Sequence, residues 1–322
     1  MLARDKVADV SGKPAQIWRR AVILGAACAV AVATVYLLAV WTAAGQRFED
    51  EVLRAADLVV GSAEQARALN TLDAITVPSV VAAVILVLLI GLLRRRLFLG
   101  FLSVGMIAAS IVTTEVFQRF LQRPILLAHG YRREDQSFPS GHATVAMSLM
   151  CAVVMVVPYR FRGVAVFLTS LWAAGVGVAT VTASWHRPSD TIGSDLIVVG
   201  YACGAVAVLA RWGRVREAAS RTPLGRALRG LLAGAYAVVA VAAFAVAAAV
   251  VALVLTTDRI DTSDAVLLAG RSLALSGSAA VAVALLGLLR HVDLGAPTTG
   301  PGEEGSRDVE PGHAGVHRPS GA

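Results

Sequence analysis

Charged side chains are scarce in this chain of 322 residues. Lys, Arg, Asp and Glu together make up 16% of it, whereas 57% is hydrophobic, and the mean hydropathy is +0.69. Soluble globular domains carry about 25% charged residues. The shortage excludes an ordinary soluble domain and predicts that lipid is the solvent for most of this chain.

Cysteine is also rare, with only Cys28, Cys151 and Cys203. Each falls inside an apolar stretch, so none is placed to cross-link an external loop. The sequence also has no Cys/His spacing and no carboxylate cluster of the kind that holds a metal ion. We therefore expect neither a metal ion nor any other cofactor.

Long apolar segments account for most of the sequence. Such segments of about 17 to 25 residues are long enough to cross a hydrocarbon core of roughly 30 Å. Because the backbone finds no water partners inside a bilayer, each is expected to be a helix. The predicted spans are residues 21–41, 74–93, 97–117, 141–157, 163–183, 191–210, 230–255 and 265–289.

Basic residues lie in short clusters at alternate ends of successive spans. The net charge of +7 is therefore interpreted as a topology signal and not as a surface for nucleic acid. By the positive-inside rule, the clusters and both termini are cytoplasmic in a cell-membrane protein. The clusters are residues 19–20, 94–96, 160–162, 211–229 and Arg290. The loops expected outside are residues 42–73, 118–140, 184–190 and 256–264.

The predicted fold class is all-α, a polytopic membrane helical bundle with a six-helix core and an appended C-terminal helical hairpin. Residues 42–73 mix charged and apolar residues at helical spacing, which predicts one or two amphipathic helices on the outer surface. The C-terminal residues, rich in Gly, Pro and charge, predict disorder. The expected units are a cytoplasmic segment 1–20, a core 21–211, a basic linker 212–229, two further helices 230–290 and a cytoplasmic tail 291–322.

A polar segment, residues 137–144, begins one predicted span. Ser140 suits a helix N-cap, Gly141 allows close backbone approach, and His142 falls in the first turn. A helix N-terminus offers free N–H groups and the positive end of the helix dipole, which favour an anion such as phosphate. The alternative is an ordinary capped helix with a histidine at the membrane interface.

A second polar segment, residues 184–190, follows the next span and contains His186 and Asp190. The two are four residues apart, so in a helix the carboxylate reaches one imidazole nitrogen. That contact leaves the other nitrogen available as a nucleophile or base. The alternative is a hydrogen bond at the interface with no chemical role.

Topology connects the two segments. His142 begins one span and His186 follows the next, and the charge pattern, which uses neither residue, places both on the outer face. A nucleophilic histidine and a second histidine that protonates a leaving oxygen are what cleavage through a phosphohistidine requires. The sequence thus predicts a metal-independent phosphatase site.

These residues resemble the type 2 phosphatidic acid phosphatase superfamily, which includes lipid phosphate phosphatases and vanadium haloperoxidases. The resemblance covers roughly residues 97–210. The family's Pro-Ser-Gly-His motif is complete as residues 139–142, and His186 and Asp190 match the His and Asp of its Ser-Arg...His...Asp motif.

The resemblance also implies a role for each residue. His186 would attack phosphorus, Asp190 would orient it, and His142 would protonate the leaving group. Ser140 and Gly141 would hold phosphate oxygens. A haloperoxidase is disfavoured, because that branch is soluble and its vanadate site should require every cation of the family pattern.

Two cationic positions of the family pattern differ here. Arg123 matches the Arg of a Lys...Arg-Pro motif, but the Lys position holds Gln118, or Val116 under strict spacing, and the Arg position of the third motif holds Thr180. Without replacements, transition-state charge would be under-stabilised by several kcal/mol. Nearby candidates are Arg119, Arg132, Arg133 and Arg187. The expected phosphate-binding set is Arg123, Ser140, Gly141, Arg187 and Gln118.

The leading hypothesis is a phosphatase that removes phosphate from a phospholipid or polyprenyl (di)phosphate at the outer leaflet. A substrate anchored in the same bilayer suits a site at helix ends near the headgroups. Two alternatives stay open: a catalytically weakened member that binds anionic lipids or scaffolds partners, and phosphotransfer to an acceptor other than water. Glu115 and Asp195, at outer ends of spans, are assigned structural or helix-end roles.

Overall fold

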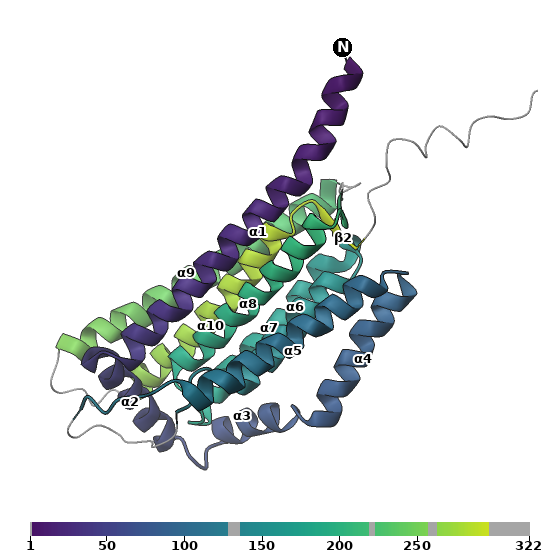
Figure 1. The fold of residues 1–322 in the computed structure, drawn as a ribbon. Helices are drawn as coiled ribbons and strands as arrows, with labels where there is room; N and C mark the ends of the chain where they lie inside the picture. The colour runs from purple at the N-terminus through teal and green to yellow at the C-terminus, as the bar shows by residue number, and fades with distance from the viewer. Residues whose placement is uncertain (1, 128–135, 219–222, 257–262, 296–322) are drawn as a thin grey trace, which may run out of the picture.

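The computed structural model is a bundle of long helices, which confirms the predicted fold class (Figure 1). It describes residues 2–127, 136–218, 223–256 and 263–295. Its helices are α1 (Leu2–Val40), α2 (Ala43–Leu58), α3 (Ala63–Asp73), α4 (Val77–Leu93), α5 (Leu97–Phe120), α6 (Gly141–Val156), η1 (Tyr159–Phe161), α7 (Arg162–Thr182), α8 (Pro188–Arg211), α9 (Pro223–Thr256) and α10 (Ser263–Leu288). Its strands are β1 (Val215–Glu217) and β2 (Val292–Leu294).

All eight predicted spans are helical, but they are not eight full-length spans. In the described part of the chain, six helices are long and apolar enough to cross a membrane, in α1, α5, α7, α8, α9 and α10. α4 reaches that length only together with α3, from which it is bent by 55°, and α6 has only 16 residues. The protein is therefore a multi-pass membrane protein in which α4 and α6 depart from the predicted length.

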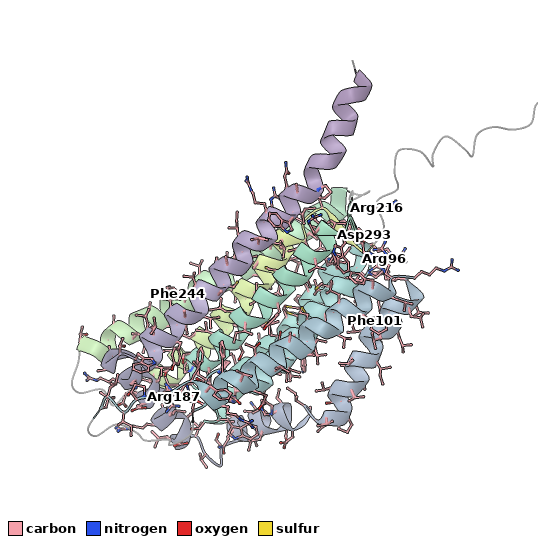
Figure 2. All side chains as sticks on the ribbon, viewed as in Figure 1. Arg96, Phe101, Arg187, Arg216, Phe244 and Asp293 are labelled. Carbon is pink, nitrogen blue, oxygen red and sulfur yellow. The ribbon has the colours of Figure 1, made fainter. Side chains whose placement is uncertain are left out.

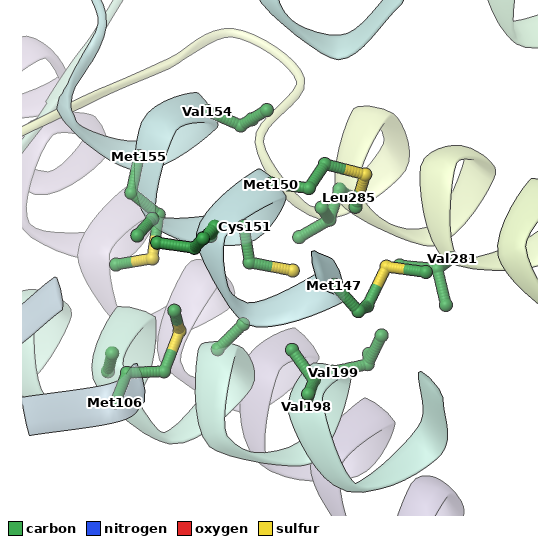
Figure 3. Packing of buried hydrophobic residues seen from close by; sticks show 14 of the residues in the cluster. Met106, Met147, Met150, Cys151, Val154, Met155, Val198, Val199, Val281 and Leu285 are labelled. Carbon is green, nitrogen blue, oxygen red and sulfur yellow. The ribbon is translucent and has the colours of Figure 1, made fainter. Parts of the chain in front are cut away.

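α6 is short because other helices, and not lipid, surround it. It packs against α5, α7 and α8, and 12 of its 16 residues are buried. Figure 3 shows Met150 of α6 beside Leu285 of α10, and Met147 of α6 beside Val281 of α10. A helix enclosed in this way need not match the thickness of the hydrocarbon core.

The two amphipathic helices predicted within residues 42–73 are present as α2 and α3. Thr42 caps α2 by accepting a hydrogen bond from Gly45 N, and Ser62 caps α3 in the same way. The turn from α1 into α2 is tight, because a Cβ at Gly45 would lie 2.2 Å from Leu38 O. α2 also packs against α10, so it covers one end of the bundle (Figure 1).

The predicted C-terminal pair of helices is present, and α10 is an integral part of the bundle. α9 packs chiefly on α10, whereas α10 also contacts α2, α7 and α8. Ser278 of α10 donates a hydrogen bond to Asp195 of α8 at 3.1 Å. Asp195, which was assigned a structural or helix-end role, thus contacts a neighbouring helix.

The observed elements cross three of the predicted boundaries. The segment 1–20 is not separate from the first span, because α1 is helical from Leu2 and projects past the other helices (Figure 1). The linker 212–229 is shortened by α9, which begins at Pro223. The tail 291–322 begins with an ordered strand, because β2 pairs antiparallel with β1. Residues 296–322 lie outside the described residues.

Side-chain ion pairs hold the β1–β2 pair at the end of the bundle opposite α2. Asp293 of β2 accepts hydrogen bonds from Arg96 at 2.7 and 2.8 Å and from Arg94 at 3.2 Å. Figure 2 shows Arg96 and Asp293 at this end and Arg187 at the other. The paired charges explain why the chain stays ordered beyond α10.

Candidate active site

The segment before α6 is joined directly to the start of α8. Ser140 accepts a hydrogen bond from Ala143 N at 3.4 Å, which makes it the predicted N-cap of α6. Its own N–H donates to Asp190 O at 3.0 Å, and Ser194 Oγ donates to Ser140 O at 2.7 Å. These bonds bring the two predicted polar segments together at one end of the bundle.

Phe138 anchors the same segment against α8. Its ring is fully buried, and its centroid lies 5.4 Å from that of Tyr36 in α1. A Cβ at Gly193 would lie 2.5 Å from this ring, so only glycine fits at that position of α8. The close approach fixes how far the start of α6 lies from α8.

A tight turn between α7 and α8 places His186. Ser184 has a positive φ of 57°, and the N–H groups of Trp185 and His186 both donate to Thr180 O, at 3.1 and 3.2 Å. The Thr180 hydroxyl donates back to Gly177 O at 2.8 Å. Thr180, which stands where the family pattern has Arg, therefore shapes the turn and supplies no charge to the site.

Asp190 is fully buried and holds His186. Its Oδ2 atom lies 3.4 Å from His186 Nδ1 and accepts hydrogen bonds from Ser137 Oγ at 2.6 Å and from Arg187 N at 3.0 Å. The latter two donors fix the carboxylate, and the carboxylate in turn orients the imidazole. With Nδ1 engaged in this way, Nε2 is the ring nitrogen available for chemistry.

His142 lies beside this pair. Its ring centroid is 5.4 Å from that of Trp185, the residue before His186, and the two imidazoles interact electrostatically. Neither histidine is fully buried, so each combines a protein environment with access from outside. The structure thus brings the two predicted histidines to the same end of the bundle.

An apolar groove of about 350 Å³ leads to His142. It lies between α4, α5 and α6, and Gly141, His142 and Thr144 are the α6 residues nearest the helix start that line it. Its other lining residues are Ile75, Thr76, Val77, Val80, Val81, Ile111, Thr114, Glu115 and Val145. Glu115, assigned a structural role, lies in the wall of this groove.

The sequence analysis missed a buried acid, Glu49 of α2. One of its oxygens forms an ion pair with Arg123 Nη2 and lies 4.0 Å from Arg187 Nε. Burial raises the pKa of Glu49, against the opposing effect of Arg123. Burial, and then the charge of Arg123, lower the pKa of Arg187. Both predicted phosphate-binding arginines are thus engaged by one carboxylate.

A sequence signal for Glu49 does exist. Val52, Leu53 and Ala56 follow it by three, four and seven residues, so all four lie on one face of α2. The three apolar residues are buried, and so is Glu49. An acid on the apolar face of an amphipathic helix indicates a buried cationic partner.

Gln118, at the expected lysine position, has a structural contact. Its side-chain amide donates to Pro139 O at 2.6 Å and so supports the segment before α6. Val116, the position under strict spacing, is exposed, as is Arg119. The two remaining candidate replacements, Arg132 and Arg133, lie outside the described residues.

Several polar atoms around Asp190 are buried without a hydrogen-bond partner. Among the residues that the structure describes, they include Arg123 Nη1, Arg187 Nε and Asp190 Oδ1. Buried polar atoms are normally paired, so such a group marks a site with capacity for a polar ligand or water. Across residues 2–127, 136–218, 223–256 and 263–295, no three His, Cys, Asp or Glu side chains are grouped so as to hold a metal ion.

Comparison with known proteins gives one match. A family model described as the PAP2 superfamily matches residues 25–216, which is more than half of the chain and includes His142, His186 and Asp190. No curated protein and no solved structure matches the chain. The match begins in α1 and ends in β1, so α9 and α10 lie beyond it.

Proposed function

This chain belongs to the PAP2 superfamily, and from that premise we propose that it is a membrane phosphatase that cleaves a lipid phosphate through a phosphohistidine. The observation that carries the proposal is the Asp190–His186 contact beside His142. A held nucleophile and a nearby proton donor are the two groups that this chemistry needs.

In the first step, His186 Nε2 attacks phosphorus and forms an N–P bond as the bond from phosphorus to the leaving oxygen breaks. Protonated His142 gives its proton to that oxygen, so the lipid leaves as an alcohol. Asp190 accepts the hydrogen bond from Nδ1–H and stabilises the charge that develops on the ring. The free N–H groups at the start of α6 donate hydrogen bonds to phosphate oxygens.

In the second step, water attacks the phosphorus of the phosphohistidine. Neutral His142 accepts a proton from this water, the P–N bond breaks, and its electron pair returns to Nε2 of His186. Inorganic phosphate leaves, and both histidines regain their starting protonation. His142 thus serves first as acid and then as base.

The groove that ends at His142 supports a lipid substrate. Its walls are mostly Val, Ile and Thr, and α4, which forms one side, bends away from α3. A hydrocarbon chain lying in this groove would hold its phosphate beside His142. This arrangement suits a phospholipid phosphate or a polyprenyl (di)phosphate.

The proposed location is the outer leaflet of the cell membrane. It rests on the clusters of arginine, which gather at the end of the bundle opposite His186 and are cytoplasmic by the positive-inside rule. Both termini are then cytoplasmic.

A weakened, lipid-binding member of the family is the second candidate. It is favoured by the pairing of Glu49 with Arg123 and by the uncharged residues Gln118 and Thr180 at two expected cationic positions. Such a protein would bind phosphate lipids without turnover. Activity separates the two candidates.

The test is phosphate release by the purified protein from short-chain phosphatidic acid and from a polyprenyl diphosphate, with a chelator present. The expected result is turnover that falls by at least about 10²-fold in His142→Ala and in His186→Ala. His317→Ala, beyond the family match, is the matched control and keeps full activity. Absence of turnover in the unaltered protein would support the lipid-binding candidate, and loss of turnover with the chelator would overturn the metal-independent mechanism.

A further inference from the structure

A second pocket lies at the end of the bundle opposite His186. It has a volume of about 350 Å³ and is formed by η1, the start of α7, the first part of α9 and the end of α10. Three arginines line it, Arg162, Arg229 and Arg290, together with His291, and none of its lining residues is acidic. We infer that this pocket binds the phosphate group of an anionic phospholipid in the leaflet opposite the candidate active site.

Arg162 supplies a buried positive charge. It is 2% exposed, and its donors reach only carbonyl groups: Nε to Val154 O at 3.2 Å, and Nη1 to Leu289 O at 3.3 Å and Val292 O at 2.5 Å. Its Nη2 atom is buried and has no hydrogen-bond partner among the residues that the structure describes. A guanidinium that is fixed by its other nitrogens and keeps a free donor suits a phosphate oxygen.

The other two arginines contact neutral side chains. Arg229 Cζ lies 4.3 Å from the centroid of the Tyr159 ring, whose centroid is 5.4 Å from Arg162 Cζ. Arg290 Nε donates to His291 Nε2 at 3.2 Å. In the part of the chain that the structure describes, none of the three arginines forms an ion pair with a carboxylate.

The neighbouring arginines provide an internal contrast. Arg94 and Arg96, at the same end of the bundle, share Asp293 and so are neutralised within the protein. Among the described residues the pocket arginines form no such ion pair, although the charge of Asp293 also acts on Arg162. Close like charges repel one another, and a bound anion would offset the repulsion among these three arginines.

The position of the pocket along the bundle, and the residues that line it, favour a lipid over a small anion. Its cations lie at helix ends, at headgroup level, whereas Ala233, Val283 and Leu286 line it along α9 and α10. A basic site between helix ends at the membrane surface with an apolar wall matches a phospholipid, whose phosphate and acyl chains are joined. Free phosphate would contact the cations of the pocket and leave its apolar wall without a ligand.

The test is binding of dioctanoyl phosphatidylglycerol to the purified full chain in neutral detergent, measured by calorimetry. We expect saturable binding that weakens by about fivefold in Arg229→Gln and in Arg290→Gln. Arg211→Gln is the matched control, because Arg211 is an exposed arginine at the same end but outside the pocket. Dioctanoyl phosphatidylcholine is expected to show no saturable binding.

Three outcomes would overturn the assignment. Equal binding by the unaltered chain and both pocket variants would show that the lipid does not use these arginines. Equal weakening in Arg211→Gln would indicate diffuse surface charge. Inorganic phosphate that binds as tightly as the lipid, with the same dependence on Arg229 and Arg290, would make this a small-anion site.

Discussion

Glu49 of α2 is paired with Arg123, which lies 74 residues further along the chain, and the same carboxylate approaches Arg187. These two arginines are the cations expected to hold phosphate. An internal carboxylate already lies between them, so a phosphate group must either share these guanidinium groups with Glu49 or displace it. Mutation of Glu49 therefore tests how strongly phosphate competes with this carboxylate for the two guanidinium groups.

Replacing Glu49 with glutamine removes the internal anion and leaves two buried cations close together. We expect Glu49→Gln to lower the Tm, since breaking a buried ion pair costs about 3 kcal/mol. We also expect inorganic phosphate to restore much of the loss and to inhibit turnover at lower concentration than in the unaltered protein. The measurement is Tm against phosphate concentration.

Glu51→Gln is the control, because Glu51 lies in the same helix with a side chain that is 41% exposed and forms an ion pair with Arg54 at 3.6 Å. Its Tm and its response to phosphate should match those of the unaltered protein. If phosphate stabilises Glu49→Gln no more than it stabilises Glu51→Gln, Arg123 and Arg187 are not phosphate ligands.

Gly193→Ala tests how the two polar segments are held together. The added Cβ would lie 2.5 Å from the Phe138 ring, so the ring must move and carry Ser140 and His142 with it. We expect destabilisation by about 1–3 kcal/mol and a clear loss of turnover. Gly204→Ala, in the same helix with open space around its Cβ, should change neither. Similar behaviour of the two variants in a Tm and phosphate-release comparison would contradict this role of Phe138.

Val81→Trp tests whether the groove beside His142 holds a hydrocarbon chain. Val81 lines the groove on the α4 side, and an indole there would fill part of the space. KM for a long-chain lipid phosphate should rise by about tenfold, whereas KM for a short water-soluble phosphate ester should hardly change. Leu92→Trp, an exposed site at the other end of α4, is the control. An equal effect on both substrates would show that the groove has no part in recognising the lipid chain.

Asp293→Asn tests the ion pairs of Asp293 with Arg94 and Arg96, at the end of the bundle opposite His186. Burial acts to raise the pKa of Asp293, but the hydrogen bond and charge of Arg96, with Arg94, outweigh it and lower the pKa. A lowered folded-state pKa means that the ionised carboxylate stabilises the protein above its unfolded-state pKa of about 3.9, and that this stabilisation is lost as pH falls through the folded-state value.

The unaltered protein should therefore be more stable than Asp293→Asn by about 1 kcal/mol at neutral pH, a modest effect because the pair is partly exposed. The difference in Tm should persist down to about pH 5 and disappear below the ordinary carboxyl range. A difference independent of pH would mean that packing, and not charge, holds β2. Arg95→Gln, at an exposed position beside Arg96, is the control.

The sequence by itself determined the membrane environment, the helical class and the two polar segments. A membrane-spanning helix is recognised from the hydropathy of about 20 consecutive residues. An N-cap such as Ser140, or an i, i+4 pair such as His186 and Asp190, depends on neighbours within one or two helical turns. Local spacing is therefore enough to indicate which side chains lie near one another within each segment.

Only the tertiary structure decided which segments meet. Glu49 reaches Arg123 because α2 folds back over the end of the bundle, α6 is short because its neighbours enclose it, and β2 is ordered because Arg96 and β1 hold it. Each of these contacts joins residues far apart in the chain. Their free energy comes from packing and charge across helices, which no local pattern contains.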